Sequence, residues 1–183
     1  AESTYQEYLH SLMSRDASKT HENAWMRIHT TIIDKGNYAQ VSAAFTWLSD
    51  LVWRGTDVVG LSITQGTFMG GTGSGFHSYK DYQGSHTVNF LLKDFSEQGH
   101  GITYKFPLVS YVDSKVTNEF SFIQASIHKE GQSEGLNGTY GHQRLSVALV
   151  PDFSIDRSGF LSCVGLNVGM TYDQYSGYVD TAW

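Results

Sequence analysis

Eight histidines and a scattered set of acids are the side chains of this sequence best suited to chemistry. The closest local set of metal-ligand types is His77, Asp81 and His86. These residues lack the His-Glu-x-x-His or Cys-x-x-Cys spacing that fixes a metal ion on one element. We therefore predict neither a metal site nor a cofactor.

The glycine-rich stretch 70–86 is the second candidate for chemistry. A phosphate-binding loop needs a strand before it, a helix after it and a Lys-Ser/Thr pair or the G-x-G-x-x-G spacing. A serine nucleophile elbow needs G-x-S-x-G on a strand-turn-helix. No helical pattern follows residues 70–86, and Gly73-Ser74-Gly75 is too short for the elbow. We predict no catalytic residue in this stretch and interpret it as a surface loop that can contact a ligand.

Glycoside hydrolysis needs two carboxylates about 5–10 Å apart across a cleft. Glu119 and Asp57 are the acids nearest to predicted strands, whereas Asp152 and Asp156 lie in a predicted loop. No two of these acids share the face of one strand. A secreted polysaccharide hydrolase or lyase, with Glu119 and Asp57 converging in a groove, is therefore the alternative to a binding protein.

Loops rich in Tyr, Ser and Gly are typical of binding surfaces, since Tyr offers contact area at low entropic cost and Ser and Gly adapt. Two such loops are expected, at residues 66–84 and 130–138. Exposed aromatic rings also stack well on sugars. From these loops and the residues that follow them, we predict ligand contacts by Phe76, His77, Tyr79, Asp81, Tyr82, His86, Tyr140 and His142.

The composition limits the possible partners. The 183 residues carry a formal net charge of -6 with only 16% charged residues, so a nucleic-acid backbone would be repelled. No apolar run reaches roughly 18 residues, the length of a membrane-spanning helix, and we predict no membrane insertion. Cys163 is the sole cysteine, which excludes an internal disulfide. Aromatic residues make up 14% of the chain and glycine outnumbers proline 19 to 2, a balance that favours β structure.

The periodicity of the chain changes after its first segment. An apolar stripe with helical spacing, bounded by possible capping residues, predicts a short helix over residues 4–14, followed by a linking loop over 15–23. From residue 24 the period is two. Alternating apolar residues predict a hairpin of Met26–Ile32 and Val41–Trp47 joined at Asp34-Lys-Gly-Asn.

The same alternation predicts further strands along the chain. In the strand over 115–128, the apolar parity changes between Phe122 and Ile123, which indicates a β-bulge. The aromatic tail 172–183 is predicted to dock as a strand or clasp on the domain or on a neighbouring subunit. The other strands are expected at 59–63, 88–92, 102–108, 145–149 and 160–172.

Many short strands without helical crossovers indicate an all-β fold, an antiparallel sandwich or jelly roll, with a barrel as a further possibility. We expect a single domain over residues 1–183, with the helix and linking loop in 1–23 and the β-sandwich in 24–183.

The strand sequences Ala24-Trp-Met-Arg-Ile-His-Thr-Thr-Ile-Ile and Val41-Ser-Ala-Ala-Phe-Thr-Trp resemble, in texture, the receptor-binding heads of viral and bacteriophage fibres. The resemblance extends over most of the chain, includes no diagnostic motif and carries across no binding residue. It implies a compact β-sandwich, commonly trimeric and without cofactors, that binds a glycan or protein on a cell surface.

These observations favour a non-enzymatic, lectin-like attachment module that binds a glycan or cell-surface receptor. We expect an extracellular, secreted or virion-surface location and a homo-oligomer, with a trimer favoured. A structural virion or assembly subunit is the third hypothesis, in which the tail and the N-terminal helix would contact neighbouring copies.

Overall fold

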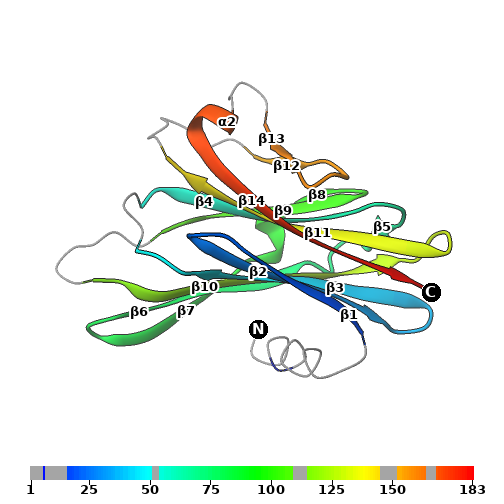
Figure 1. The fold of residues 1–183 in the computed structure, drawn as a ribbon, viewed down its shortest axis with the longest axis horizontal. Helices are drawn as coiled ribbons and strands as arrows, with labels where there is room; N and C mark the ends of the chain where they lie inside the picture. The colour runs from blue at the N-terminus through cyan, green and yellow to red at the C-terminus, as the bar shows by residue number, and fades with distance from the viewer. Residues whose placement is uncertain (1–5, 7–15, 51–53, 109–114, 145–151, 164–167) are drawn as a thin grey trace.

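The computed structural model describes residue 6 and residues 16–50, 54–108, 115–144, 152–163 and 168–183. Within these ranges, two antiparallel sheets pack face to face as a sandwich and do not close into a barrel (Figure 1). The predicted all-β, antiparallel sandwich is confirmed. The predicted helix over 4–14 lies outside the described residues except for Gln6, which is helical and exposed.

Sheet A contains the predicted first hairpin. Its strand order is β1-β2-β3-β10-β6-β7, and β5 pairs with β10 beside this path. The strands are β1 (Ala17–Glu22), β2 (Met26–Asp34), β3 (Tyr38–Trp47), β5 (Thr67–Phe68), β6 (Ser74–Asp81), β7 (Gly84–Asn89) and β10 (Thr117–His128).

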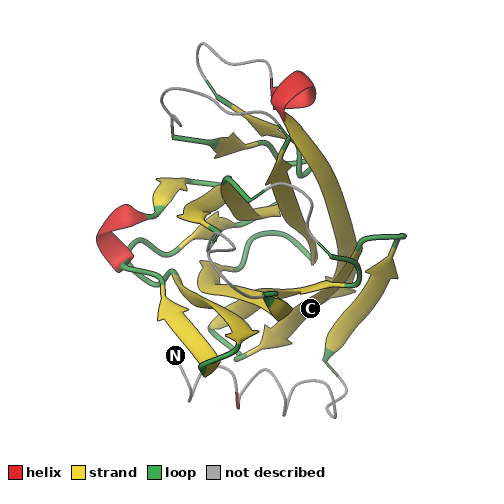
Figure 2. Cartoon of the chain, turned by 90° about the vertical axis from the view of Figure 1, so that its left-hand side faces the viewer, coloured by secondary structure: helices red, strands yellow, loops and turns green. Residues whose placement is uncertain are grey.

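Sheet B has the strand order β14-β11-β4-β9-β8, and a third, two-stranded sheet joins β12 to β13. Figure 2 shows these layers from the side. The remaining elements are β4 (Thr56–Ile63), η1 (Leu92–Asp94), β8 (Ser96–Gln98), β9 (Gly101–Pro107), β11 (Ser133–Gln143), β12 (Ser154–Ile155), β13 (Leu161–Ser162), α2 (Val168–Thr171) and β14 (Tyr172–Ala182).

The β2–β3 hairpin forms where the sequence predicts it. The Asp34 side chain accepts a hydrogen bond from the Gly36 amide at 2.8 Å, and the Lys35 amide donates to the Tyr38 carbonyl at 2.9 Å. Gly36 has a φ of 84°, in the left-handed region that glycine adopts at little cost. The turn therefore fixes the register that pairs Ile33 with Gln40.

The main core lies between the two sheets. Alternate residues of each strand point inward, as the period of two predicts, and each large apolar side chain buried here contributes about 1.5–3 kcal/mol. Its members include Met26, Ile28, Ile32, Val41, Ala43, Phe45, Val59, Leu61, Ile63, Ile102, Tyr104, Phe106, Ile123, Leu136 and Tyr140.

The predicted bulge between Phe122 and Ile123 is wrong. From Phe120 to His128, β10 pairs with β3 without interruption, and the register shift lies earlier, between Thr117 and Phe120. The apolar parity changes because both faces of the strand are buried. Ile123 belongs to the inter-sheet core, while Phe122 packs in a separate cluster with Phe76 and Ala44 on the opposite face of sheet A.

Three predicted loops are wrong because they contain strands. Residues 15–23 include β1, residues 66–84 include β5 and β6, and residues 130–138 include the start of β11. In β11 the glycines have a packing role. A Cβ on Gly138 would lie 2.5 Å from the Cβ of Ala43 in the facing sheet. Glycine in a strand can therefore mark close approach of another backbone as well as a turn.

The C-terminal half departs from prediction in a similar way. Within the expected strand over 160–172, the described residues form the short strand β13 and the short helix α2, which precedes β14; residues 164–167 lie outside the described residues. The expected strand over 88–92 ends at Asn89, and the one over 145–149 lies outside the described residues. The aromatic tail docks as predicted, on its own domain, because β14 pairs with β11 from Ser133↔Ala182 to Gln143↔Tyr172.

Candidate functional site

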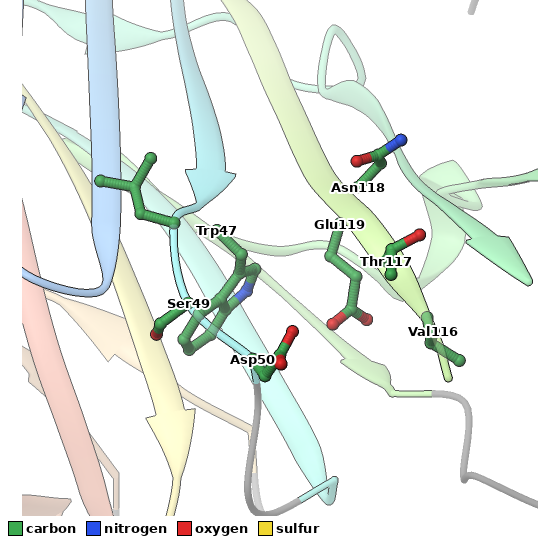
Figure 3. A pocket seen from close by; sticks show the side chains of 8 residues that line it. Trp47, Ser49, Asp50, Val116, Thr117, Asn118 and Glu119 are labelled. Atoms are coloured by element: carbon green, nitrogen blue, oxygen red, sulfur yellow. The ribbon is translucent and has the colours of Figure 1, made fainter. Parts of the chain in front are cut away.

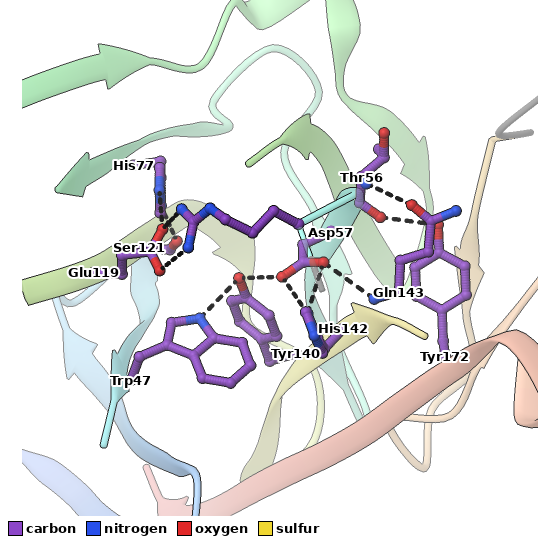
Figure 4. Close-up of polar contacts among 11 residues, drawn as sticks. Trp47, Thr56, Asp57, His77, Glu119, Ser121, Tyr140, His142, Gln143 and Tyr172 are labelled. Atoms are coloured by element: carbon purple, nitrogen blue, oxygen red, sulfur yellow. Dashed lines mark hydrogen bonds and ion pairs between the residues drawn. The ribbon is translucent and has the colours of Figure 1, made fainter. Parts of the chain in front are cut away.

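Polar side chains gather between the sheets at one end of the sandwich (Figure 4). Trp47 is the last residue of β3, Asp57 lies at the start of β4, Glu119 lies near the start of β10 and His142 lies near the end of β11. These strands begin and end together, so the sandwich places their terminal side chains side by side. The inter-sheet space, which the apolar core fills along the middle of the strands, is charged here.

Asp57 organises the first of two networks. Its side chain is fully buried and accepts hydrogen bonds from the Tyr140 hydroxyl at 2.7 Å and from the Gln143 amide at 3.1 Å, with His142 Nδ1 at 3.0 Å. The Tyr140 oxygen in turn accepts from Trp47 Nε1 at 3.2 Å. Burial and the Asp57 charge raise the pKa of Tyr140 well above its ordinary value, so the hydroxyl stays a donor.

Arg54 and Glu119 form the second network. Both side chains are 5% exposed, and the guanidinium holds both carboxylate oxygens, with Nη1 donating to Oε2 at 2.9 Å. His77 lies behind them, its Nδ1 2.9 Å from the Ser121 hydroxyl and its Nε2 3.6 Å from Glu119 Oε1. Burial raises the pKa of Glu119, but His77 and Arg54 together outweigh it and leave that pKa below its usual value. Glu119 is therefore ionised at neutral pH.

A pocket of about 430 Å³ opens beside these networks. This volume lies within the range of about 300–1,000 Å³ typical of small-molecule sites. Figure 3 shows the Asp50 and Glu119 carboxylates directed toward the space beside the Trp47 ring. The other lining residues are Leu48, Ser49, Val116, Thr117 and Asn118.

The aromatic wall of the pocket is held rigidly. The Trp47 ring meets the Tyr140 ring at 89° with centroids 5.5 Å apart, and the His142 ring at 77° with centroids 4.9 Å apart. Edge-to-face contacts of this kind are favourable ring geometries. Together with the Nε1 hydrogen bond, they fix the orientation of the indole, so a ligand meets a preformed surface.

The opposite wall contains an irregular backbone. Asn118 has a φ of 53° and is the one non-glycine residue with a positive φ among those the structure describes. It lies within the register shift between Thr117 and Phe120. Bulges of this kind redirect side chains and recur next to binding sites. Here the bulge lies where β10 enters the pocket, immediately before Glu119.

The structure separates the predicted ligand contacts into three places. Phe76 is buried on the outer side of sheet A, while His77, Tyr140 and His142 belong to the two buried networks. The remaining residues lie on the β6–β7 hairpin. The Tyr79 and His86 rings stack there with centroids 4.9 Å apart, and His86 Nε2 lies 2.8 Å from Asp81 Oδ1. Tyr82, at the turn, is 73% exposed.

The eight residues therefore do not form one surface, and of the five predicted within the loop 66–84 only Tyr82 lies outside a strand. The possible metal set is also divided, since His77 faces Ser121 while His86 faces Asp81. Among the described residues, no group of three or more His, Cys, Asp or Glu side chains is arranged to hold a metal ion.

Sequence reasoning identified Glu119 and Asp57 as candidate acids but missed Arg54 and Asp50. Arg54 pairs with a partner 65 residues away, and no local spacing reveals such a contact. Asp50 forms an exposed ion pair with Lys115 at 2.7 Å on the pocket rim. Trp47 was expected only as the last residue of a predicted strand. Its position at the end of an alternating strand was the available signal.

The fold and pocket define an antiparallel β-sandwich with a polar, tryptophan-walled pocket at one end. No protein-family profile and no curated protein matches the sequence. Similar solved structures include a pore-forming protein, with 8% identity over 92% of this chain and 91% of that chain and a TM-score of 0.42.

Two further similar structures have lower TM-scores. The Clostridium perfringens delta-toxin has 6% identity over 90% of this chain and 87% of its own, with a TM-score of 0.34. AvmM, which catalyses macrocyclization in alchivemycin A biosynthesis, has 13% identity over 87% of this chain and 94% of that chain, with a TM-score of 0.29. What is shared is a β-rich architecture, and no activity passes to this chain from it. Among the described residues, no helix is long and apolar enough to cross a membrane.

Proposed function

We propose that this protein is a non-enzymatic binding module that holds a saccharide in the pocket between Trp47 and Glu119. The observation that carries the proposal is the convergence of two carboxylates beside a fixed indole ring in one open pocket (Figure 3). A glycan on a cell surface is the ligand source that we propose, with the protein acting outside the cell.

The chemistry of the pocket fits a sugar on two counts. A pyranose has a face of C–H groups that packs on an aromatic ring, and Trp47 supplies such a ring. Its rim carries hydroxyl groups, and the Asp50 and Glu119 carboxylates are strong acceptors for them. Arg54 and Lys115 already contact these carboxylates, but a purely apolar ligand would cover their remaining lone pairs without a donor, at a cost in desolvation.

The same contacts argue against the two-carboxylate hydrolase. Such an enzyme needs one acid with a raised pKa that protonates the leaving group. The pKa of Glu119 is instead lowered, and Arg54 occupies both of its oxygens. Asp57 is fully buried and engaged by Tyr140, His142 and a backbone amide. Glu119 and Asp57 do reach the same end of the sandwich, but as parts of supporting networks.

Self-association is part of the proposal. Three aliphatic side chains in and directly after edge strand β7 are more than half exposed: Val88, Leu91 and Leu92. A module that binds weakly through single sugars gains strength when several copies act together. Light scattering on the purified chain measures the number of copies, and a monomer at high concentration would remove this part of the proposal.

The test of the proposed function is a glycan array probed with the wild-type protein and two variants. Asp50→Asn changes the pocket at an exposed residue, so it leaves the fold intact, and we expect at least a tenfold loss of affinity. Tyr82→Ala is the matched control, because Tyr82 is exposed on the β6–β7 hairpin, and it should bind as wild type. Silence of the wild type across the array would contradict the proposal, as would a loss in Tyr82→Ala alone.

A further inference from the structure

We propose that the pocket selects an uncharged pyranose, two of whose hydroxyl groups donate hydrogen bonds, one to Glu119 and one to Asp50. Arg54 is the positioning residue that holds the Glu119 carboxylate for this contact. This inference rests on the proposed function and specifies its ligand. It sets neutral sugars apart from acidic sugars, such as uronic and sialic acids.

The first step concerns hydrogen-bond polarity. An ionised carboxylate only accepts hydrogen bonds. The lone pairs that Arg54 and Lys115 leave on the two carboxylates are therefore best satisfied by a ligand that donates from two positions. Hydroxyl groups on neighbouring ring carbons meet this requirement, and the C–H face of the same ring can lie on Trp47.

The second step concerns charge. Two cations of the described residues lie at the pocket, and each is engaged by one of its acids: Arg54 by Glu119 inside the protein, and Lys115 by Asp50 on the rim. These pairs offset the two acids and do not create an anion site. A sugar carboxylate would lie against oxygens that only accept hydrogen bonds, and neither cation could approach it without leaving its present contact.

The third step concerns Arg54. The arginine is 5% exposed and is not part of the pocket lining. Its two-point contact fixes the plane of the Glu119 carboxylate, and with it the direction of the oxygen lone pairs that remain for a ligand. On the far side, His77 Nε2 lies 3.6 Å from the same carboxylate, and the Ser121 hydroxyl contacts Nδ1 of that histidine ring. Arg54 thus acts on the ligand only through Glu119.

The ligand class is tested by calorimetry on a panel of neutral methyl pyranosides and their uronic-acid counterparts at one pH and ionic strength. We expect the acidic sugars to bind wild type at least tenfold more weakly than the neutral sugars. Asp50→Asn should reduce this ratio of the two affinities. Equal or tighter binding of the acidic sugars would overturn the ligand class and leave the proposed function standing. Failure of every sugar to bind would instead refute the proposed function.

The role of Arg54 is tested by Arg54→Lys, which keeps the charge but loses the two-point contact. We expect weaker binding of neutral sugars, and a loss of binding on acidification that begins at higher pH than in wild type. A purely structural role would leave that pH profile unchanged, and an unchanged profile overturns the positioning role. Should Arg54→Lys fail to fold, the pKa of Glu119 in wild type is measured by NMR with and without a neutral sugar. A lower pKa with the sugar supports a hydrogen bond from the sugar to Glu119, and an unchanged pKa overturns it.

Discussion

Replacing Glu119 with Gln should destabilise the protein far more than the same change at an exposed ion pair. Glu119 and Arg54 are each 5% exposed, so the variant leaves a guanidinium charge inside the protein without its carboxylate. Breaking a buried pair in this way costs about 3–5 kcal/mol. At roughly 2–4 °C per kcal/mol for a chain of this size, the melting temperature should fall by about 6–20 °C.

Urea unfolding followed by tryptophan fluorescence measures this loss. The matched control is Asp50→Asn, because Asp50 and Lys115 form a pair of similar length with side chains 66% and 62% exposed. Exposed pairs are worth about 0–1 kcal/mol, so the control should unfold almost as wild type. The double variant Arg54→Met with Glu119→Leu removes both charges and should recover most of the stability.

Two outcomes would refute the reasoning about this pair. The first is a Glu119→Gln variant that loses no more than the Asp50→Asn control. The second is a double variant as unstable as the single one, which would mean that packing rather than the unpaired charge sets the cost. A coupling energy of several kcal/mol between Arg54 and Glu119 is the quantity that the structure requires.

Three further predictions follow from the interior. Tyr140→Phe removes one hydroxyl that both donates and accepts, and should cost about 1–3 kcal/mol in urea unfolding without creating a cavity. Gly138→Ala should cost about 1–3 kcal/mol or more, because its Cβ would lie 2.5 Å from that of Ala43, whereas Gly99→Ala, with no atom within 4 Å, should change stability by less than about 1 kcal/mol. The pKa of Glu119 in the folded protein lies below the ordinary value of 4.5. The stability that its ionised form contributes is therefore fully present above that pH and is lost as the pH falls through the folded pKa. The difference in unfolding free energy between wild type and Glu119→Gln should narrow only below about pH 4.5, as unfolding measured over an acid titration would show.

The sequence predicted the strands whose inward face shows clear apolar alternation. In β2, β3, β4 and β9, every second residue faces the main core, although the outer face also buries Ala44 of β3 and Val58 of β4. Phe45 and Leu61, for example, are fully buried at predicted inward positions. The period of two reports such a face directly, and the fold class follows from the number of strands that show it.

Strands that pack on both faces were missed or misinterpreted. In β11, glycine at position 138 is required by the approach of Ala43, so the strand resembles a loop in composition. In β10, Phe122 and Ile123 serve two different clusters, and their adjacency was mistaken for a bulge. In both strands, contacts with other strands determine the residue types, and the local sequence does not identify those contacts.

The candidate site was predictable only in part for the same reason. Glu119 and Asp57 stood out as acids near strands, but their partners Arg54 and Tyr140 lie 65 and 83 residues away in the sequence. The pairing of strands, rather than any spacing along the chain, brings them together. The predicted binding residues Tyr140 and His142 lie behind Trp47, which they support, and not on the surface.

The corner between the first and the last strands has a consequence for how the chain folds. His21 Nε2 lies 2.8 Å from the Tyr178 carbonyl oxygen, and 157 residues separate the two in sequence. Contacts over such separations form slowly because the loop-closing entropy is lost before they form, and β proteins of this kind fold in roughly milliseconds to seconds. Until β14 arrives, the edge of β11 stays open to other chains, and β1 lacks its contacts with β14 in the facing sheet. We expect crowding during synthesis to be most harmful in that interval, when an open strand edge can pair with another molecule before the chain's own C-terminal strand can reach it.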